Sequence, residues 1–154
     1  MALSVIEVRD QLPQETAVVR HRLSMHEVDR IPGWIGVTFE AILRAGQQPA
    51  GMPFARTLSV DAEGMDLEVG WPVGAPFEGD AEVHGGTLPG GLLAVASYFG
   101  PYEGIGPAYE AIRAWCAEHG REINGPPWES YFTDPNEEPD PAKWRTDIHF
   151  PIRA

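Results

Sequence analysis

The sequence has few of the groups that cross-link a chain, bind phosphate or cross a membrane. Its single cysteine, Cys116, excludes an intrachain disulfide and a cysteine-based zinc site. It has 11 lysines and arginines but 23 aspartates and glutamates, which gives a net charge of −12. This negative charge repels nucleic acid and attracts cations. No apolar run approaches the roughly 20 residues that span a bilayer. The first ten residues include Glu7, Arg9 and Asp10 rather than the apolar stretch of a signal peptide. We therefore expect a cytoplasmic protein without a membrane partner.

Motifs for metal and phosphate binding are also missing. The five histidines show no metal-ligand spacing. The glycine-rich stretch at residues 84–91 lacks the GxxxxGK[ST] form of a phosphate-binding loop. The sequence therefore predicts neither a metal site nor a cofactor.

What the sequence does contain is an internal repeat at an offset of 74 residues. Apolar side chains follow the i, i+3, i+4, i+7 spacing of one buried helix face over residues 31–45, and again over residues 105–119. Gly46 and Gly120 follow these segments at the same offset, where glycine commonly ends a helix. The pattern predicts helices at Ile31–Ala45 and Ile105–His119.

Runs rich in β-forming residues flank both helices in the same order. One run precedes each helix and two follow it, and the last run of each half ends on an aromatic-Pro-aliphatic sequence. The expected strands are Thr16–Ser24, Phe54–Ser59 and Leu67–Val73 in the first half, and Leu92–Phe99, Trp128–Thr133 and Thr146–Ile152 in the second.

This order predicts an α+β fold of two pseudo-symmetric β-α-β-β halves, each an antiparallel sheet with one long helix. The halves span about residues 16–73 and 92–152 of a single domain, 1–154, and a joint rich in Gly and Pro connects them at 74–91. We expect a ligand cleft between the halves, because concave sites are where small molecules usually bind.

Alternation along the last strand predicts which side chains face away from the helix. Ile148 and Phe150 are expected on the helix side, which leaves Asp147 and His149 on the free face.

The preceding strand offers a carboxylate and a phenol for the same free face. If Trp128 packs on its helix as its repeat mate Phe54 should, Glu129 and Tyr131 point into the cleft. The first half has Ala55 where the second has Glu129, so the second half would supply the charge of the site.

These residues resemble the GyrI-like small-molecule-binding domains, which also form the effector-binding part of many AraC-type and MerR-type regulators. Three elements carry the resemblance, namely Gly100-Pro101-Tyr102-Glu103, Trp128-Glu129-Ser130-Tyr131 before an Asp-Pro turn, and the final aliphatic-x-aromatic-Pro-aliphatic strand. The similarity runs from about Thr16 to Ile152, and we therefore expect no helix-turn-helix.

The resemblance implies a stand-alone domain that binds bulky, aromatic and cationic compounds in a cleft lined by aromatic side chains. It also implies that Glu129, on the strand after the second helix, faces the ligand, with Tyr131 beside it. The further candidates for the cleft are Tyr98, Tyr102, Trp34, Asp147 and His149.

Two other functions stay open on the same fold. Some members of the family resemble hydrolases that open strained electrophiles such as cyclopropane-containing genotoxins, and here Glu129 would be the acid or base with Tyr131 orienting the substrate. Other members are reported to protect gyrase, so the acidic chain could instead dock on a protein partner.

Overall fold

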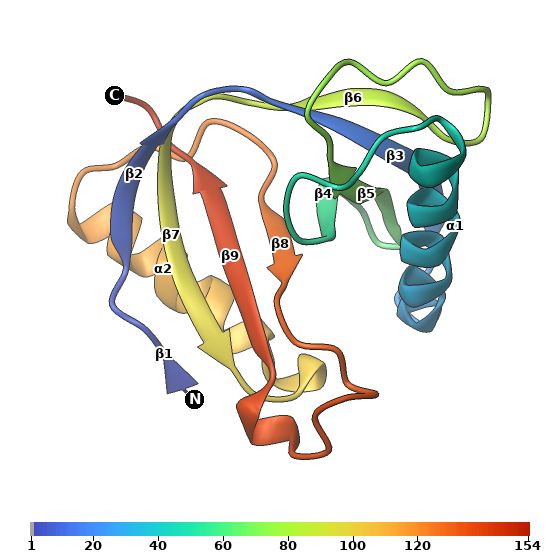
Figure 1. The fold of residues 1–154 in the computed structure, drawn as a ribbon. Coiled ribbons are helices and arrows are strands. Elements are labelled where there is room, and N and C mark those ends of the chain that lie inside the picture. The colour runs from blue at the N-terminus through green and yellow to red at the C-terminus, as the bar shows by residue number, and fades with distance from the viewer. Residues whose placement is uncertain (1) are drawn as a thin grey trace. The chain divides into compact units, whose positions relative to one another are not determined.

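A computed structural model describes residues 2–154, which form two compact units (Figure 1). Unit 1 comprises residues 2–12 and 90–154, and unit 2 comprises residues 13–89. Each unit contains one α-helix and a set of antiparallel strands, which confirms the predicted α+β class. A single domain with a ligand cleft between its halves stays a prediction.

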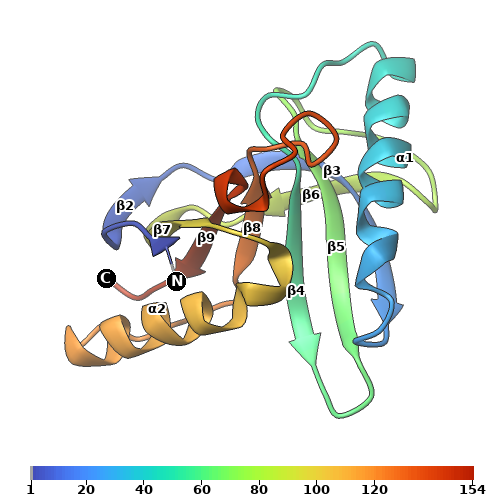
Figure 2. The same cartoon turned by 90° about the horizontal axis from the view of Figure 1, so that it is seen from below.

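Unit 2 has four strands and helix α1. The strands lie in the order β4-β5-β3-β6, and α1 packs along β5 and β3 (Figure 2). The indole Nε1 of Trp71 donates a 3.0 Å hydrogen bond to the carbonyl oxygen of Ile35, which fastens β5 to the helix. The elements are β3 (Gln14–Leu23), α1 (Ile31–Arg44), β4 (Phe54–Val60), β5 (Met65–Pro72) and β6 (His84–Leu88).

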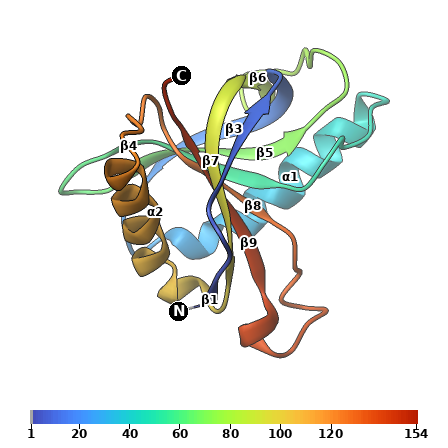
Figure 3. The ribbon, with the colours of Figure 1, turned by 90° about the vertical axis from the view of Figure 1, so that its left-hand side faces the viewer.

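Unit 1 repeats this strand order with its own elements. Strand β9 lies between β8 and β7, and both β1 and β2 pair with the other edge of β7 (Figure 3). The elements are β1 (Ala2–Leu3), β2 (Glu7–Gln11), β7 (Gly91–Phe99), η2 (Tyr102–Gly104), α2 (Gly106–Glu118), β8 (Trp128–Tyr131), η3 (Pro141–Lys143) and β9 (Arg145–Pro151).

The core of unit 1 lies between α2 and one face of its sheet. Helix α2 contributes Ala108, Ile112 and Cys116, and β9 contributes Ile148 and Phe150. All five side chains are buried, which is the burial that the helical period of the sequence predicts. This core packs the helix against β7 and β9 and so positions the site described below.

The predicted helices and the six predicted strands are confirmed to within two residues at nearly every end. Gly46 and Gly120 follow the helices with φ of 78° and 65°, the left-handed conformation that glycine adopts most readily. The Gly- and Pro-rich joint expected at 74–91 includes strand β6, which the sequence analysis did not predict and which pairs with β3. A Cβ atom at Gly85 would collide with the backbone of Phe77, so the glycine there permits close packing and does not mark a loop.

Candidate functional site

Glu129 lies on the face of the sheet that α2 covers. In the β8–β9 pairing Glu129 is opposite Ile148, and directly opposed residues in an antiparallel pair share a face. Ile148 is fully buried in the core beneath α2. The expectation that Glu129 and Tyr131 face away from the helix is therefore wrong, although their placement on one common face is right.

Trp128 lies on the opposite face, again contrary to expectation. It is paired with His149, and the two rings stack with their centroids 5.1 Å apart and their planes 10° from parallel. Unit 2 follows the same pattern, because Phe54 is opposite Gly70 while Ala55 is opposite the buried Val69. The repeat thus aligns the correct residues, and only the assignment of the faces was inverted.

Two tyrosines hold the carboxylate of Glu129, and we call these three residues the carboxylate cluster. The hydroxyl of Tyr109, on α2, donates to Oε1 at 2.6 Å. The hydroxyl of Tyr131, two residues along β8, donates to Oε2 at 2.9 Å. Each carboxylate oxygen therefore accepts one charge-assisted hydrogen bond and keeps a lone pair for another donor.

Burial raises the pKa of Glu129 above its ordinary value, and the hydrogen bonds from Tyr109 and Tyr131 oppose this rise. The pKa values of both phenols rise well above 10, first because of burial and then because of the neighbouring carboxylate. Ionisation of a phenol is therefore strongly disfavoured, and both tyrosines remain hydrogen-bond donors. The cluster is a desolvated acid with two fixed neutral donors, and it is suited to bind a positive charge or to exchange a proton.

Aromatic rings adjoin the carboxylate cluster. Tyr102, on η2, contacts the ring of Tyr131 edge-on at 5.9 Å between centroids and the ring of Trp144 at 5.4 Å. The pKa of Tyr102 is raised, by burial first and then by the charge of Glu129, which places its phenol within the field of that carboxylate. We call Tyr102, Tyr131 and Trp144 the aromatic patch. Such faces attract organic cations.

Two other predicted aromatic site residues have different surroundings. Tyr98 is 3% exposed within the core of unit 1, and its hydroxyl donates to the carbonyl oxygen of Pro101 at 2.8 Å. Trp34 belongs to α1 in unit 2, where it stacks on His21 at 4.4 Å with the guanidinium of Arg30 4.9 Å from its ring centroid. Neither residue contacts Glu129 through a hydrogen bond or ring contact within the described residues.

Asp147 and His149 are on the sheet face opposite to Glu129. Both oxygens of Asp147 accept 2.9 Å hydrogen bonds from Arg145, and Oδ1 also accepts one from Ser97 at 2.6 Å. The expected sharing of a face by Glu129, Asp147 and His149 is therefore wrong. Asp147 forms an ion pair with Arg145, and His149 stacks on Trp128.

Sequence reasoning missed Tyr109 as a partner of Glu129. The helical period places this residue on the buried face of its helix, which suggests a packing role alone. A signal was present in the repeat, because the residue 74 positions earlier is Ile35. At two matched positions the second half therefore has a polar side chain where the first half has an apolar one: Tyr109 for Ile35, and Glu129 for Ala55.

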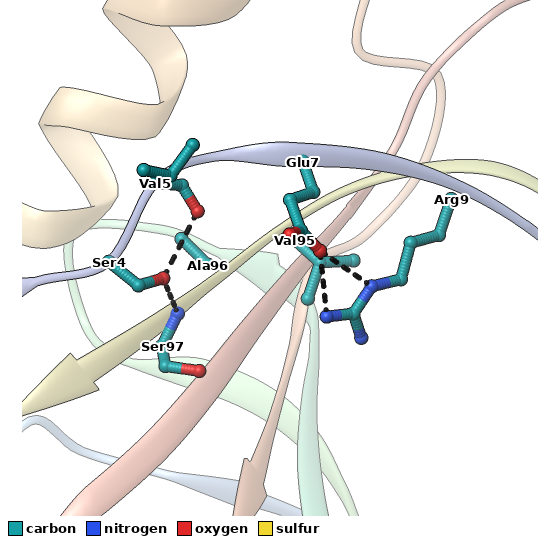
Figure 4. Close-up of a pocket in the computed structure, with 7 residues that line it drawn as sticks. All are labelled: Ser4, Val5, Glu7, Arg9, Val95, Ala96 and Ser97. Carbon is teal, nitrogen blue, oxygen red and sulfur yellow. Dashed lines mark hydrogen bonds and ion pairs between the residues drawn. The ribbon is translucent and has the colours of Figure 1, made fainter.

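A shallow hollow of about 350 Å³ lies elsewhere on unit 1, between the segment of β1 and β2 and strand β7 (Figure 4). Its polar groups already bond to one another, since Arg9 donates to Glu7 at 3.0 Å and the backbone N–H of Ser97 donates to Ser4. It includes no residue of the carboxylate cluster. This hollow therefore offers a ligand no free charged group.

Two kinds of feature are absent from residues 2–154. None of the helices in this range is both long enough and apolar enough to cross a membrane. The same residues contain no group of three or more His, Cys, Asp or Glu side chains placed to hold a metal ion.

Solved structures show where this fold occurs. The C-terminal domain of EcmrR superposes with a TM-score of 0.86 at 19% identity, covering 99% of each chain. EcmrR in its DNA complex gives a TM-score of 0.85 at 18% identity, and the present chain spans 57% of that longer chain. SAV2435 bound to tetraphenylphosphonium gives a TM-score of 0.66 at 12% identity, covering 98% of this chain and 95% of SAV2435.

The family assignment comes from the sequence. No curated protein matches it significantly. The model of the GyrI-like small molecule binding domain matches residues 5–153, which is nearly the whole chain. The chain therefore belongs to the GyrI-like small-molecule-binding domain family.

Proposed function

We propose that this protein binds aromatic organic cations at the carboxylate cluster and the aromatic patch of unit 1. The observation that carries the proposal is the desolvated carboxylate of Glu129, which accepts hydrogen bonds from two fixed phenols beside the rings of Tyr102 and Trp144. A carboxylate in such surroundings is held at a cost in free energy, and a bound cation offsets that cost.

Charge and ring chemistry both favour cations over anions of the same shape. The net charge of −12 concentrates cations near the surface and repels anions. The aromatic patch adds cation–π attraction, which is worth roughly 0.5–2 kcal/mol for one ring. Direct binding of nucleic acid is not part of the proposal, because the same negative charge opposes it.

The structural neighbour SAV2435 supports this ligand class. Its structure contains tetraphenylphosphonium, which is a positive charge surrounded by four aromatic rings. The family to which this chain belongs is likewise described by small-molecule binding. Glu129 and the aromatic patch supply the groups that such a ligand needs.

The test compares tetraphenylphosphonium with tetraphenylborate, which has nearly the same shape and the opposite charge. Titration followed by tryptophan fluorescence should show tighter binding of the cation. Glu129→Gln should lower cation affinity about ten- to a hundredfold, because a charge-assisted contact is worth roughly 1.5–3 kcal/mol. Glu110→Gln is the matched control, since Glu110 lies on the exposed side of α2 with 76% of its side chain accessible.

Equal affinity for the two probes would contradict the proposed ligand class. A loss of affinity as large in Glu110→Gln as in Glu129→Gln would show that only long-range charge matters and would contradict the site.

A second candidate function is hydrolysis of a strained electrophile, and the raised pKa of Glu129 favours it. An acid of this kind can donate a proton to a leaving atom and recover one from water. The oxygen of water would bond to the ring carbon, the strained ring bond would break, and the leaving atom would take the proton. In that case Glu129→Gln should leave binding of a cyclopropane-containing alkylating agent intact while its turnover falls by roughly 10²–10⁴.

A further inference from the structure

Thr146 carries a buried hydroxyl that no described residue satisfies. The residue has no exposed surface, and its Oγ1 has no hydrogen-bond partner among residues 2–154. A buried hydroxyl without a partner costs free energy, commonly about 1–3 kcal/mol. Such groups are rare in folded proteins and each calls for an explanation.

The position of Thr146 connects it to the candidate site. It is opposite Tyr131 across the β8–β9 pair and opposite Tyr98 across the β7–β9 pair, on the face that α2 covers. Glu129 is its diagonal neighbour, and such residues lie roughly 7–8 Å apart. The unused hydroxyl therefore belongs to the same face and the same neighbourhood as the carboxylate.

The internal repeat shows that the fold does not need a hydroxyl here. The residue 79 positions earlier is Leu67, which occupies the equivalent place on β5 and is 3% exposed. Unit 2 thus fills this position with an apolar side chain, as it does at Ala55, the mate of Glu129. The polar substitutions of unit 1 cluster around one place in the sheet, which indicates a ligand and not a packing need.

We infer that Thr146 and Glu129 together accept hydrogen bonds from a ligand, so that the site prefers aromatic primary ammonium ions to quaternary ones. This inference rests on the proposed function and deepens it. A primary ammonium carries three N–H donors, while a quaternary ammonium or a phosphonium carries none. The carboxylate keeps two lone pairs beyond its bonds to tyrosine, and the hydroxyl of Thr146 has both of its own unused.

The two probes lose different amounts of hydration when they bind, so the order of their affinities reveals which groups line the site. A primary ammonium is more strongly hydrated than its trimethylated form, so a site with aromatic rings and a charge alone favours the quaternary ion. Acceptors inside the site reverse that order, because they replace the lost water and are left unpaired by a ligand without donors. The order of the two affinities therefore reports whether hydrogen-bond acceptors face the ligand, and the loss of that order in Thr146→Val reports whether Thr146 is one of them.

Tyr102 contacts the ring of Tyr131, which is the residue opposite Thr146 across the β8–β9 pair. Its side chain remains 37% exposed at the outer side of Tyr131, and it belongs to the three-residue helix η2. The inference requires that the Tyr102 ring move outward, so that a ligand can reach Thr146.

The experiment measures two probes of equal charge, 1-naphthylmethylammonium and its N,N,N-trimethyl derivative, by calorimetry at pH 7. The wild type should bind the primary ion more tightly. Thr146→Val keeps the shape and removes the hydroxyl, and it should lower affinity for the primary ion about tenfold while leaving the trimethyl ion unchanged. Thr146→Ser restores a hydroxyl and should recover most of the preference. Urea unfolding of each variant checks that the fold is intact.

Tighter binding of the trimethyl ion by the wild type would overturn the inference, as would an equal effect of Thr146→Val on both probes. Glu129→Gln separates this failure from failure of the proposed function. If Glu129→Gln weakens both probes, the cation site stands and only the role of Thr146 is refuted. If it weakens neither, the site itself is refuted together with this inference.

Discussion

Tyr109 and Glu129 are joined by a 2.6 Å hydrogen bond that links helix α2 to strand β8. The bond crosses the interior of unit 1, so the carboxylate that we propose binds a cation also ties the helix to the sheet. If the carboxylate of Glu129 has both roles, it couples ligand binding to the stability of unit 1. Variants of Tyr109 and Glu129 measure what the carboxylate contributes to stability.

Tyr109→Phe removes the phenol and leaves the ring, which packs edge-on against Phe150 at 5.7 Å. The ionised carboxylate then loses one of its two donors, and unfolding free energy at pH 7 should fall by about 1.5–3 kcal/mol. Tyr98→Phe is the control, because its hydroxyl donates to a neutral carbonyl, and such a bond is worth about 0.5–1.5 kcal/mol. Urea unfolding of both variants measures the difference, and an equal loss in the two would contradict a special role for the carboxylate.

Glu129→Gln should change how stability depends on pH. The folded-state pKa of Glu129 is raised, so the folded protein binds this proton more tightly than the unfolded chain does. The stabilisation that Glu129 contributes is fully present below its ordinary pKa. It is lost as pH rises through the raised folded-state pKa. Wild type should therefore lose stability relative to Glu129→Gln over that interval, as unfolding curves at pH 4 and pH 7 would reveal. A constant difference between the two proteins would mean that the carboxylate is not desolvated.

Local spacing made most of the architecture predictable. The 3.6-residue period locates both helices, and the glycines after them have the positive φ that ends a helix. The repeat also aligned Glu129 with Ala55 and Tyr131 with Thr57, which are equivalent in their strand pairings. These features depend on the spacing of residues along the chain, so they can be predicted from one sequence.

The faces of β8 were not predictable because both faces of this strand are buried or partly buried. Alternation identifies the helix side only when the other side is polar and exposed. Trp128 is 4% exposed on the face away from α2, while the more polar Glu129 lies toward the helix. Hydrophobicity alone therefore assigned the larger aromatic side chain to the wrong side. The Tyr109 hydroxyl, which compensates for this arrangement, is supplied from 20 residues away.

Two glycines with different roles, one after a helix and one inside a helix, test the helix assignments. Gly120 has φ of 65°, so Gly120→Ala should destabilise the protein by roughly 1 kcal/mol. Gly36 lies inside α1 with no atom within 4 Å of the place a Cβ would occupy, so Gly36→Ala should stabilise by roughly 0.5–1 kcal/mol. Thermal unfolding of both variants should shift the midpoint in opposite directions, and shifts of the same sign would contradict either the helical placement of Gly36 or the left-handed conformation of Gly120.

His149 should make the protein sensitive to mild acid. The ring is 9% exposed and stacked on Trp128, and burial lowers its pKa from 6.5 to about 4, while the nearby Asp147 acts in the opposite direction. The unfolded chain therefore takes up this proton near pH 6.5, but the folded protein does so only near pH 4. The stabilisation that the neutral imidazole contributes is fully present above pH 6.5. It is lost as the solution is acidified toward pH 4, and the lowered pKa corresponds to a total loss of about 3 kcal/mol.

Comparison with His149→Gln isolates this contribution from that of the carboxylates. The variant keeps a polar side chain but has no group that titrates between pH 4 and 6.5 at this position. Its urea unfolding free energy should fall less steeply than that of wild type across the interval, because the acidic residues contribute equally to both proteins. Parallel curves would mean that the imidazole takes up its proton in the folded state as easily as in water. The ring would then be hydrated and not shielded by its stacking on Trp128.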